Sequence, residues 1–446
     1  MPNQLSPAPV AQQERIVIID SLRGIAILGI LLMNIPGFAL PAPACYGDIT
    51  VMNEQGTINQ TVWFGIDWFL EGTQRALFST LFGAGIILFI TRQEKRVEGL
   101  YPADYFFRRQ LWLLLFGLFN AFVLLWFWDI LFMYACCGMI LFAFRRLSSK
   151  ALIIGAGICL VLMTVRENVD YYREKSVIRK GEAVARMDTT TVKLNVEQKK
   201  MLEDMNGMKE SSSLEGRKKE MEKSLKAVQG DYAGLYKYMS QRSYFIETSF
   251  FYATIWDILV FMLLGMAFFK NGVLTGQAPT RVYLWMTLIG LGAGLVLSWY
   301  RLQPLLTYQF NKFEYTRHVP FEFYEISRTF RSIGIFGLIM LMFKSGWFKW
   351  LFALMRPVGQ MAFTNYLMQS LMGGLFFYGV GLGYFGKLQR YEIYYVVAAI
   401  WLIQIIWSHI WLRFYRFGPL EWAWRSLTYW KKQPMRKAND KEVMAP

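Results

Sequence analysis

Histidine and cysteine are scarce in this chain, which has two histidines and four cysteines among 446 residues. His318 and His409 are far apart in the sequence, and neither has cysteines at the spacing of a zinc site. Cys136, Cys137 and Cys159 lie within long apolar runs, and Cys45 lies outside them. The composition therefore excludes a disulfide framework and a cysteine-rich zinc site, and we expect no metal site.

Motifs of soluble enzymes are also absent. The chain has no Gly-Lys-Ser phosphate-binding loop and no Gly-x-Ser-x-Gly elbow. Charged residues make up only 18% of the sequence, although the formal net charge is +16. Such a charge would suggest a nucleic-acid partner in a soluble protein. Here the charges lie between long apolar runs, so we expect no nucleic-acid partner and consider the lipid bilayer as the solvent.

Apolar runs divide most of the chain. They cover residues 16–40, 76–91, 111–127, 130–144, 151–165, 250–269, 282–300, 332–343, 361–380 and 393–412. Several approach the roughly 20 residues that cross a hydrocarbon core. The sequence predicts an all-α fold, a polytopic transmembrane helical bundle of about ten spans. The shortest runs, 151–165 and 332–343, are also compatible with buried or re-entrant segments.

Lysine and arginine are distributed unequally between the loops. If the N-terminus is cytoplasmic, the loops on that side carry far more basic residues than the short loops on the other side. Arg301 and Arg328 are among the few basic residues expected outside. This bias predicts that both termini and the 92–109 loop are cytoplasmic.

Four segments follow from this pattern: a membrane half (1–165), a polar insertion (166–248), a second membrane half (249–430) and a basic cytoplasmic tail (431–446). The insertion has apolar residues at helical spacing, so we expect amphipathic helices outside the membrane. A solvated helical hairpin without chemistry is the favoured interpretation.

Ionisable and amide residues within the apolar runs are the candidate functional residues, because each costs a few kcal/mol in lipid unless it is paired or hydrated. In the first run Arg23 follows Asp20 by three residues, and Asn34 lies about three helical turns further on. Arg23 either binds an anionic ligand or extends to lipid phosphates. Asn365 and Gln369 are four residues apart in a later run.

Carboxylates are expected toward the outer side of the membrane. Asp67, Glu71 and Arg75 share one helical face, which indicates either a functional group or a solvated interfacial helix. Asp129 is expected to cap a helix start, whereas Asp257 is the better candidate base.

We predict that these polar faces converge on one cavity. The alternative is that each amide hydrogen-bonds a neighbouring helix. If Arg23, Asn34, Asn365 and Gln369 border no common pocket, acyl transfer and transport both lose the physical basis expected here.

The C-terminal motif begins where the last run ends. Pro419 suits a first helical position, and Glu421 and Arg425 are four residues apart. We expect a helix in the cytoplasmic interface that covers the inner end of the bundle.

Several motifs resemble those of the YeiB-like bacterial membrane proteins. They lie at 20–24, 33–37, 77–85, 129–135, 359–370, 378–383 and 416–428, the last being Arg416-Phe417-Gly418-Pro419-Leu420-Glu421-Trp422-x-Trp424-Arg425-Ser426-Leu427-Thr428. The resemblance implies a multi-pass protein of the bacterial inner membrane with a C-terminal domain of unknown function. The N-terminal half of this family resembles transmembrane acyltransferases, which move an acyl group from a cytoplasmic donor to an acceptor across the membrane. Two positions depart from such relatives: Asn34 stands where the O-acetylating ones have histidine, as the resemblance suggests for the heparan-alpha-glucosaminide N-acetyltransferase type, and Asn120 stands where many relatives have histidine.

Two hypotheses follow. In the first, the protein is an acyltransferase: Arg23, Arg108 and Arg109 hold the phosphates of an acyl-CoA-like donor, with Asn34 orienting it, and Asp67, Glu71 or Asp257 deprotonates the acceptor. The side chains expected to contact substrate are Arg75, Asn120, Asp129, Asn365 and Gln369. The expected partners are membrane lipid and a small-molecule or lipid substrate, with no permanently bound cofactor. In the second, the same groups serve a transporter or flippase of an anionic amphiphile.

Overall fold

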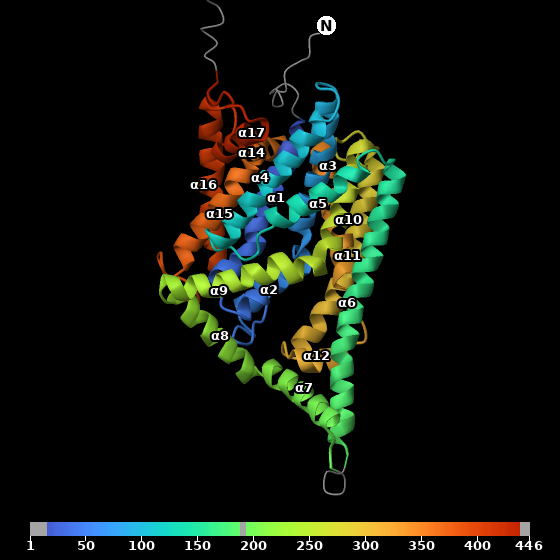
Figure 1. Cartoon of the computed structure of the whole chain (residues 1–446), viewed down its shortest axis with the longest axis vertical. Helices are drawn as coiled ribbons and strands as arrows, with labels where there is room; N and C mark the ends of the chain where they lie inside the picture. Colours follow the sequence, from blue (N-terminus) through green and yellow to red (C-terminus); the bar gives the residue numbers. More distant parts are fainter. Residues whose placement is uncertain (1–15, 188–192, 438–446) are drawn as a thin grey trace, which may run out of the picture.

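The computed structural model of the chain describes residues 16–187 and 193–437 and is built from helices (Figure 1). Within these ranges no β-strand occurs, and Tyr415 and Arg436 form an isolated bridge. The predicted all-α fold class is confirmed. The first half contains α1 (Val17–Ala39), α2 (Ile58–Phe69), α3 (Thr73–Glu94), α4 (Tyr101–Phe122), α5 (Leu131–Leu141) and α6 (Ser149–Ala185).

The remaining helices continue through the polar insertion into the second half. They are α7 (Val196–Ser212), α8 (Leu214–Gln229), α9 (Tyr232–Phe245), the π-helical turn η4 (Ile246–Phe250), α10 (Phe251–Lys270), α11 (Thr280–Thr307), α12 (Lys312–His318), α13 (Tyr324–Ser345), α14 (Lys349–Gln360), α15 (Ala362–Phe377), α16 (Ile393–Phe414) and α17 (Pro419–Tyr429).

Seven helical stretches in the described ranges are long and apolar enough to cross a membrane. They are α1, the stretch from α2 to α3, α6, the stretch from α9 to α10, α11, α13 and α16. The shortest apolar runs, 151–165 and 332–343, lie in α6 and α13, which have 37 and 22 residues. The predicted total of about ten spans stays a prediction, since α5 and α15 have only 11 and 16 residues.

Helix α1 lies at the centre of the bundle and packs against α3, α14, α15 and α16. Its contact with α14 depends on glycine. A Cβ atom at Gly24 would lie 2.1 Å from the Met355 carbonyl oxygen, and one at Gly359 would lie 1.7 Å from the Asp20 carbonyl oxygen. The two backbones therefore touch, which places the start of α1 beside the α14–α15 junction.

The polar insertion lies at the end of the bundle opposite α17, where α6, α7, α8 and α9 form a triangular frame (Figure 1). Helix α6 runs continuously across the expected boundary at residue 165. The insertion returns to the bundle, because Arg217 forms an ion pair of 2.5 Å with Asp48 and Ser224 accepts a hydrogen bond of 3.1 Å from the Ala42 amide. The predicted amphipathic helices are present as α7 and α8.

Candidate functional site

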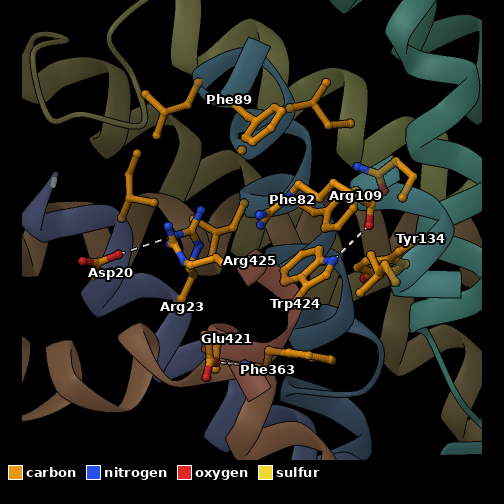
Figure 2. A pocket seen from close by; sticks show the side chains of 18 of the residues that line it. Asp20, Arg23, Phe82, Phe89, Arg109, Tyr134, Phe363, Glu421, Trp424 and Arg425 are labelled. Atoms are coloured by element: carbon orange, nitrogen blue, oxygen red, sulfur yellow. Dashed lines mark hydrogen bonds and ion pairs between the residues drawn. The ribbon is translucent and has the colours of Figure 1, made fainter. Parts of the chain in front are cut away.

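The candidate site is a cavity of about 230 Å³ bordered by α1, α3, α4, α5, α14, α15 and α17 (Figure 2). It extends along α3 from Phe78 to the residues just after the helix, ending at Arg96. At 1.5 Å per residue this stretch of helix is about 27 Å long. The cavity is therefore long and narrow, with a distinct environment at each end.

One end of the cavity carries several arginines, which we call the arginine group: Arg23, Arg92, Arg96, Arg109 and Arg425. They come from the start of α1, the end of α3, the first half of α4 and the middle of α17. The carboxylates in the lining are fewer, namely Asp20 and Glu421. Asp20 lies 3.4 Å from Arg23. The lining at this end thus has a net positive charge that favours an anionic ligand.

Aromatic residues hold Arg109 in place. Its guanidinium lies 3.6 Å from the ring centre of Trp424 and 5.2 Å from that of Phe89. The Trp424 indole N–H also donates a hydrogen bond of 2.9 Å to the Arg109 carbonyl oxygen. Helix α17 therefore fixes the orientation of one arginine in the group (Figure 2).

Helix α17 also closes the cavity beside α15. It begins with Pro419 at the first helical position, as predicted. Glu421 does not act mainly as a helix partner of Arg425: it accepts hydrogen bonds from the Phe363 and Thr364 amides at 2.8 and 3.0 Å and from the Thr364 hydroxyl at 2.5 Å. Burial raises the pKa of Glu421, and these donors oppose the rise. Its carboxylate therefore caps the start of α15.

The other end of the cavity is apolar and aromatic. Phe78, Phe82 and Leu113 line it, and Tyr134 and Tyr366 lie at its deep end together with Leu131 at the start of α5. The Tyr134 hydroxyl donates to the Arg75 carbonyl oxygen at 3.1 Å and lies 2.5 Å from the Ser79 hydroxyl. An acyl chain fits this environment, because its apolar surface leaves water on entering.

The predicted convergence of the amides on this cavity is wrong. Asn34, Asn365 and Gln369 are not among its lining residues. The Asn365 amide donates to the Val358 carbonyl oxygen and the Ser408 hydroxyl, both at 3.1 Å.

Gln369 donates to the Ile27 carbonyl oxygen at 3.1 Å and to Gln404 at 3.0 Å. These bonds join α15 to α14, α1 and α16, so the amides make the interhelical contacts of the simpler alternative. The common pocket on which acyl transfer and transport were first expected to depend is therefore absent. Of its four expected residues, only Arg23 borders the cavity.

Adjacent arginines on α4 have different surroundings. Arg109 lines the cavity, whereas Arg108 forms an ion pair of 2.5 Å with Asp104 and donates to the Thr428 carbonyl oxygen at 3.3 Å. Only one of the two predicted donor-binding arginines on this helix therefore borders the cavity.

The predicted outer carboxylates belong to a separate group of ion pairs, which we call the charge network. It consists of equal numbers of carboxylates and arginines: Asp67, Glu71, Asp257, Glu325, Arg75, Arg301, Arg328 and Arg331. Asp257 lies between Arg75, at 2.8 Å, and Arg328. The two arginines stabilise the Asp257 carboxylate, so it accepts a proton poorly and is a poor base.

Arginines of the charge network were missed or misplaced by the sequence analysis. Arg328 was assigned to an outer loop and Arg331 was not considered, but both lie in α13 and are 1% and 0% exposed. The sequence contained a signal for their burial, because Arg328 and Arg331 follow Tyr324 by four and seven residues within a helical apolar pattern.

Asp129 has the capping role that the sequence favoured. It accepts a hydrogen bond of 2.9 Å from the Phe132 amide at the start of α5, and Asn120 donates to it at 2.8 Å. The Tyr366 hydroxyl donates to the same carboxylate at 3.4 Å. Asn120 and Asp129 do not line the cavity themselves, but Tyr366 connects Asp129 to its deep end.

Comparisons with known proteins agree with this architecture. Residues 268–431 match the family described as "Protein of unknown function (DUF418)". The chain is 30% identical over 437 residues to "Uncharacterized protein YeiB" of Escherichia coli (strain K12), with 93% of this chain and 96% of that protein covered. The chain belongs to the YeiB family. The YeiB family match confirms the resemblance drawn from the motifs, and together with the candidate spans it identifies an integral membrane protein.

Other relatives share the same extent. The chain is 29% identical over 441 residues to "Uncharacterized protein YxaH" of Bacillus subtilis (strain 168), with 96% of this chain and 98% of that protein covered. It is 24% identical over 433 residues to "Uncharacterized 39.9 kDa protein in amylase 3'region" of Bacillus acidopullulyticus, with 96% and 97% covered. No solved structure matches the chain.

Proposed function

We propose that this YeiB-family protein binds a phosphate-bearing amphiphile of the acyl-CoA class in the cavity and uses it as the donor in acyl transfer at the bacterial inner membrane. The observation that carries the proposal is the polarity of the cavity, with the arginine group at one end and an apolar aromatic lining at the other. Guanidinium groups bind phosphate oxygens through charge-assisted hydrogen bonds, and the apolar end accommodates the acyl chain.

The proposed orientation places the arginine group on the cytoplasmic side. The start of α1, the end of α3 and α17 meet at this end, and these are the segments that the basic bias assigns to the cytoplasm. A soluble cytoplasmic donor then reaches its phosphate site directly from water. Both termini and the 92–109 loop are cytoplasmic in this orientation, and the insertion is outside.

Acyl transfer also needs a group that accepts the proton of the acceptor. Asp67, Glu71 and Asp257 are paired with arginine or tyrosine in the charge network and do not line the cavity. Asp20 and Glu421 line the arginine end of the cavity, and at the apolar end Asp129 is connected to it through Tyr366. We therefore assign proton acceptance to Asp129 in place of the three carboxylates first considered.

The second candidate function is transport of an intact anionic amphiphile. Asp67, Glu71 and Asp257, the three expected bases, do not line the cavity. This favours transport, because binding and release need no base. The arginine group would then hold the head group during passage.

Purified protein in lipid vesicles with palmitoyl-CoA labelled in its acyl chain distinguishes the two. Acyl transfer predicts free CoA and label in a covalent product, and loss of both with Arg23→Ala. Movement of intact palmitoyl-CoA across the vesicle without free CoA would support transport instead. Absence of palmitoyl-CoA binding would refute both.

A further inference from the structure

Glu247 is an acidic residue buried at the junction of the insertion and the membrane part. It lies on the π-helical turn η4, where α9 crosses the bundle and α10 begins to run along it (Figure 1). The residue is 6% exposed, and neither of its carboxyl oxygens has a hydrogen-bond partner within the described ranges. A buried, unpartnered carboxylate costs several kcal/mol, so a protonated carboxyl is the stable form here.

Glu247 lies near the end of α4, where Asn120 binds Asp129. One helical turn before it, Ser243 donates a hydrogen bond of 3.0 Å to the Ala121 carbonyl oxygen, which directs this face of the helix toward the end of α4. The neighbouring residue Asn120 is the donor to Asp129, and its own side-chain oxygen is buried without a partner. Glu247 and Asp129 thus both lie next to the end of α4, close enough for their charges to repel each other, and no hydrogen bond joins them.

The titratable groups around the two carboxyls are uncharged at neutral pH. Cys136 on α5 and Tyr366 on α15 are titratable side chains close enough for the charge of Glu247 to affect them. Within the described ranges no lysine or arginine forms an ion pair with Glu247 or Asp129. Two carboxylates without a compensating cation cannot both ionise in a low-dielectric interior.

Glycine allows this arrangement on the α4 side. A Cβ atom at Gly117 would lie 2.4 Å from the Phe132 amide nitrogen and 2.8 Å from a carboxylate oxygen of Asp129. Helix α4 therefore approaches the start of α5 closely and shields the Asp129 carboxylate from lipid. The carboxyls are enclosed by protein.

We propose that Glu247 and Asp129 form a proton-binding site, the acid pair, in which Glu247 holds the proton while Asp129 accepts its hydrogen bonds as a carboxylate, and which communicates with the cavity through Tyr366. Tyr366 lines the deep end of the cavity and donates its hydroxyl hydrogen to Asp129, while the Ile130 amide donates to the tyrosine oxygen at 3.2 Å. A ligand chain that displaces Tyr366 removes a donor from Asp129, which favours proton uptake by the pair. The site goes beyond the proposed function, because it exists without an acyl-CoA ligand.

Infrared difference spectroscopy of the purified protein in lipid nanodiscs tests the pair without any ligand. We expect a protonated-carboxyl band at neutral pH that disappears in Glu247→Gln. The matched control Glu215→Gln leaves the band unchanged, since Glu215 is 81% exposed and forms an ion pair with Lys219. Asp129→Asn should retain the band and shift its loss to lower pH by about one unit, because a negative neighbour is removed.

A second comparison tests the connection to the cavity. Tyr366→Phe should shift the loss of the band to higher pH, because Asp129 loses a donor. Tyr378→Phe is the control, since the Tyr378 hydroxyl donates to the Leu125 carbonyl oxygen and not to the pair. If Glu247→Gln does not fold, Glu247→Asp replaces it and should move the band frequency.

Three results would overturn the proposal: no such band in the wild-type protein, a band that neither Glu247 variant changes, or equal effects of Tyr366→Phe and Tyr378→Phe. None of these depends on palmitoyl-CoA binding. Failure of the proposed function is therefore distinguishable from failure of the acid pair.

Discussion

Arg23 and Arg108 offer a matched test of the arginine group. Their side chains are 31% and 24% exposed, and each pairs with an aspartate of its own helix, Asp20 or Asp104. Only Arg23 borders the cavity. Replacing each arginine with glutamine therefore removes an ion pair within one helix, with a buried aspartate for Arg23 and a half-exposed one for Arg108.

The expected effect on ligand binding differs sharply between the two variants. A charge-assisted hydrogen bond contributes about 1.5–3 kcal/mol, so Arg23→Gln should weaken palmitoyl-CoA binding by roughly 10- to 100-fold. Arg108→Gln should change it by less than about 2-fold, since its guanidinium is committed to Asp104 and Thr428. Arg23→Lys should recover part of the affinity, because it keeps the charge but loses the planar donor arrangement.

Equilibrium binding of labelled palmitoyl-CoA to detergent-solubilised protein measures these affinities, and thermal unfolding of the same samples checks the fold. Increasing salt should weaken wild-type binding more than Arg23→Gln binding, because the variant has lost one phosphate contact. Equal affinities for the Arg23 and Arg108 variants, with intact folds, would refute the assignment of the arginine group to the ligand head group.

The remaining predictions concern packing, charge and topology. Gly294→Ala should destabilise the fold by about 1–3 kcal/mol, because its Cβ atom would lie 2.6 Å from a backbone nitrogen of α13. Gly292→Ala is the control: its Cβ atom would meet nothing within 4 Å, so the variant should be neutral or stabilising in thermal unfolding. Equal effects of the two variants would contradict the α11–α13 contact. Asp257→Asn should lower stability by about 3–5 kcal/mol, because Arg328 stays buried without that carboxylate, and a wild-type unfolding temperature would count against the ion pair. A cysteine placed in the 166–248 insertion should react with an impermeant reagent in intact cells and one in α17 should not; the reverse pattern would invert the proposed topology.

The sequence predicted the helical class and the C-terminal helix well, because both depend on local pattern. Apolar runs long enough for a bilayer leave little choice of secondary structure. Pro419 at a first helical position predicted the start of α17, and the structure begins the helix there. The amides Asn365 and Gln369 were recognised as buried, but their partners lie on α1, α14 and α16, which the sequence does not place around α15.

The cavity was harder to predict, because its lining comes from separate helices whose rotation is set by packing. Arg92 and Arg96 were assigned to the cytoplasmic 92–109 loop, since a basic residue near a helix end is ordinarily exposed to the cytoplasm, and Arg425 was expected on a helix in the interface. Glu247 was not singled out because it lies in the charged insertion by sequence. Its aromatic neighbours Phe245 and Phe250 were the available signal that this acid enters the apolar part of the bundle.

The charge network and the acid pair differ in a way that determines which of them binds a proton. In the charge network the carboxylates and arginines are equal in number, and Asp257 is paired on two sides, so protonation would leave Arg75 and Arg328 without their partner in a buried position. The acid pair has no cation, so full ionisation would leave two negative charges unbalanced in the protein interior. Proton binding is therefore unfavourable at Asp257, whereas the acid pair must bind a proton. Tyr134 connects the cavity to the balanced group and Tyr366 connects it to the unbalanced one. A ligand chain at the deep end contacts both tyrosines, and only its contact with Tyr366 changes the number of bound protons.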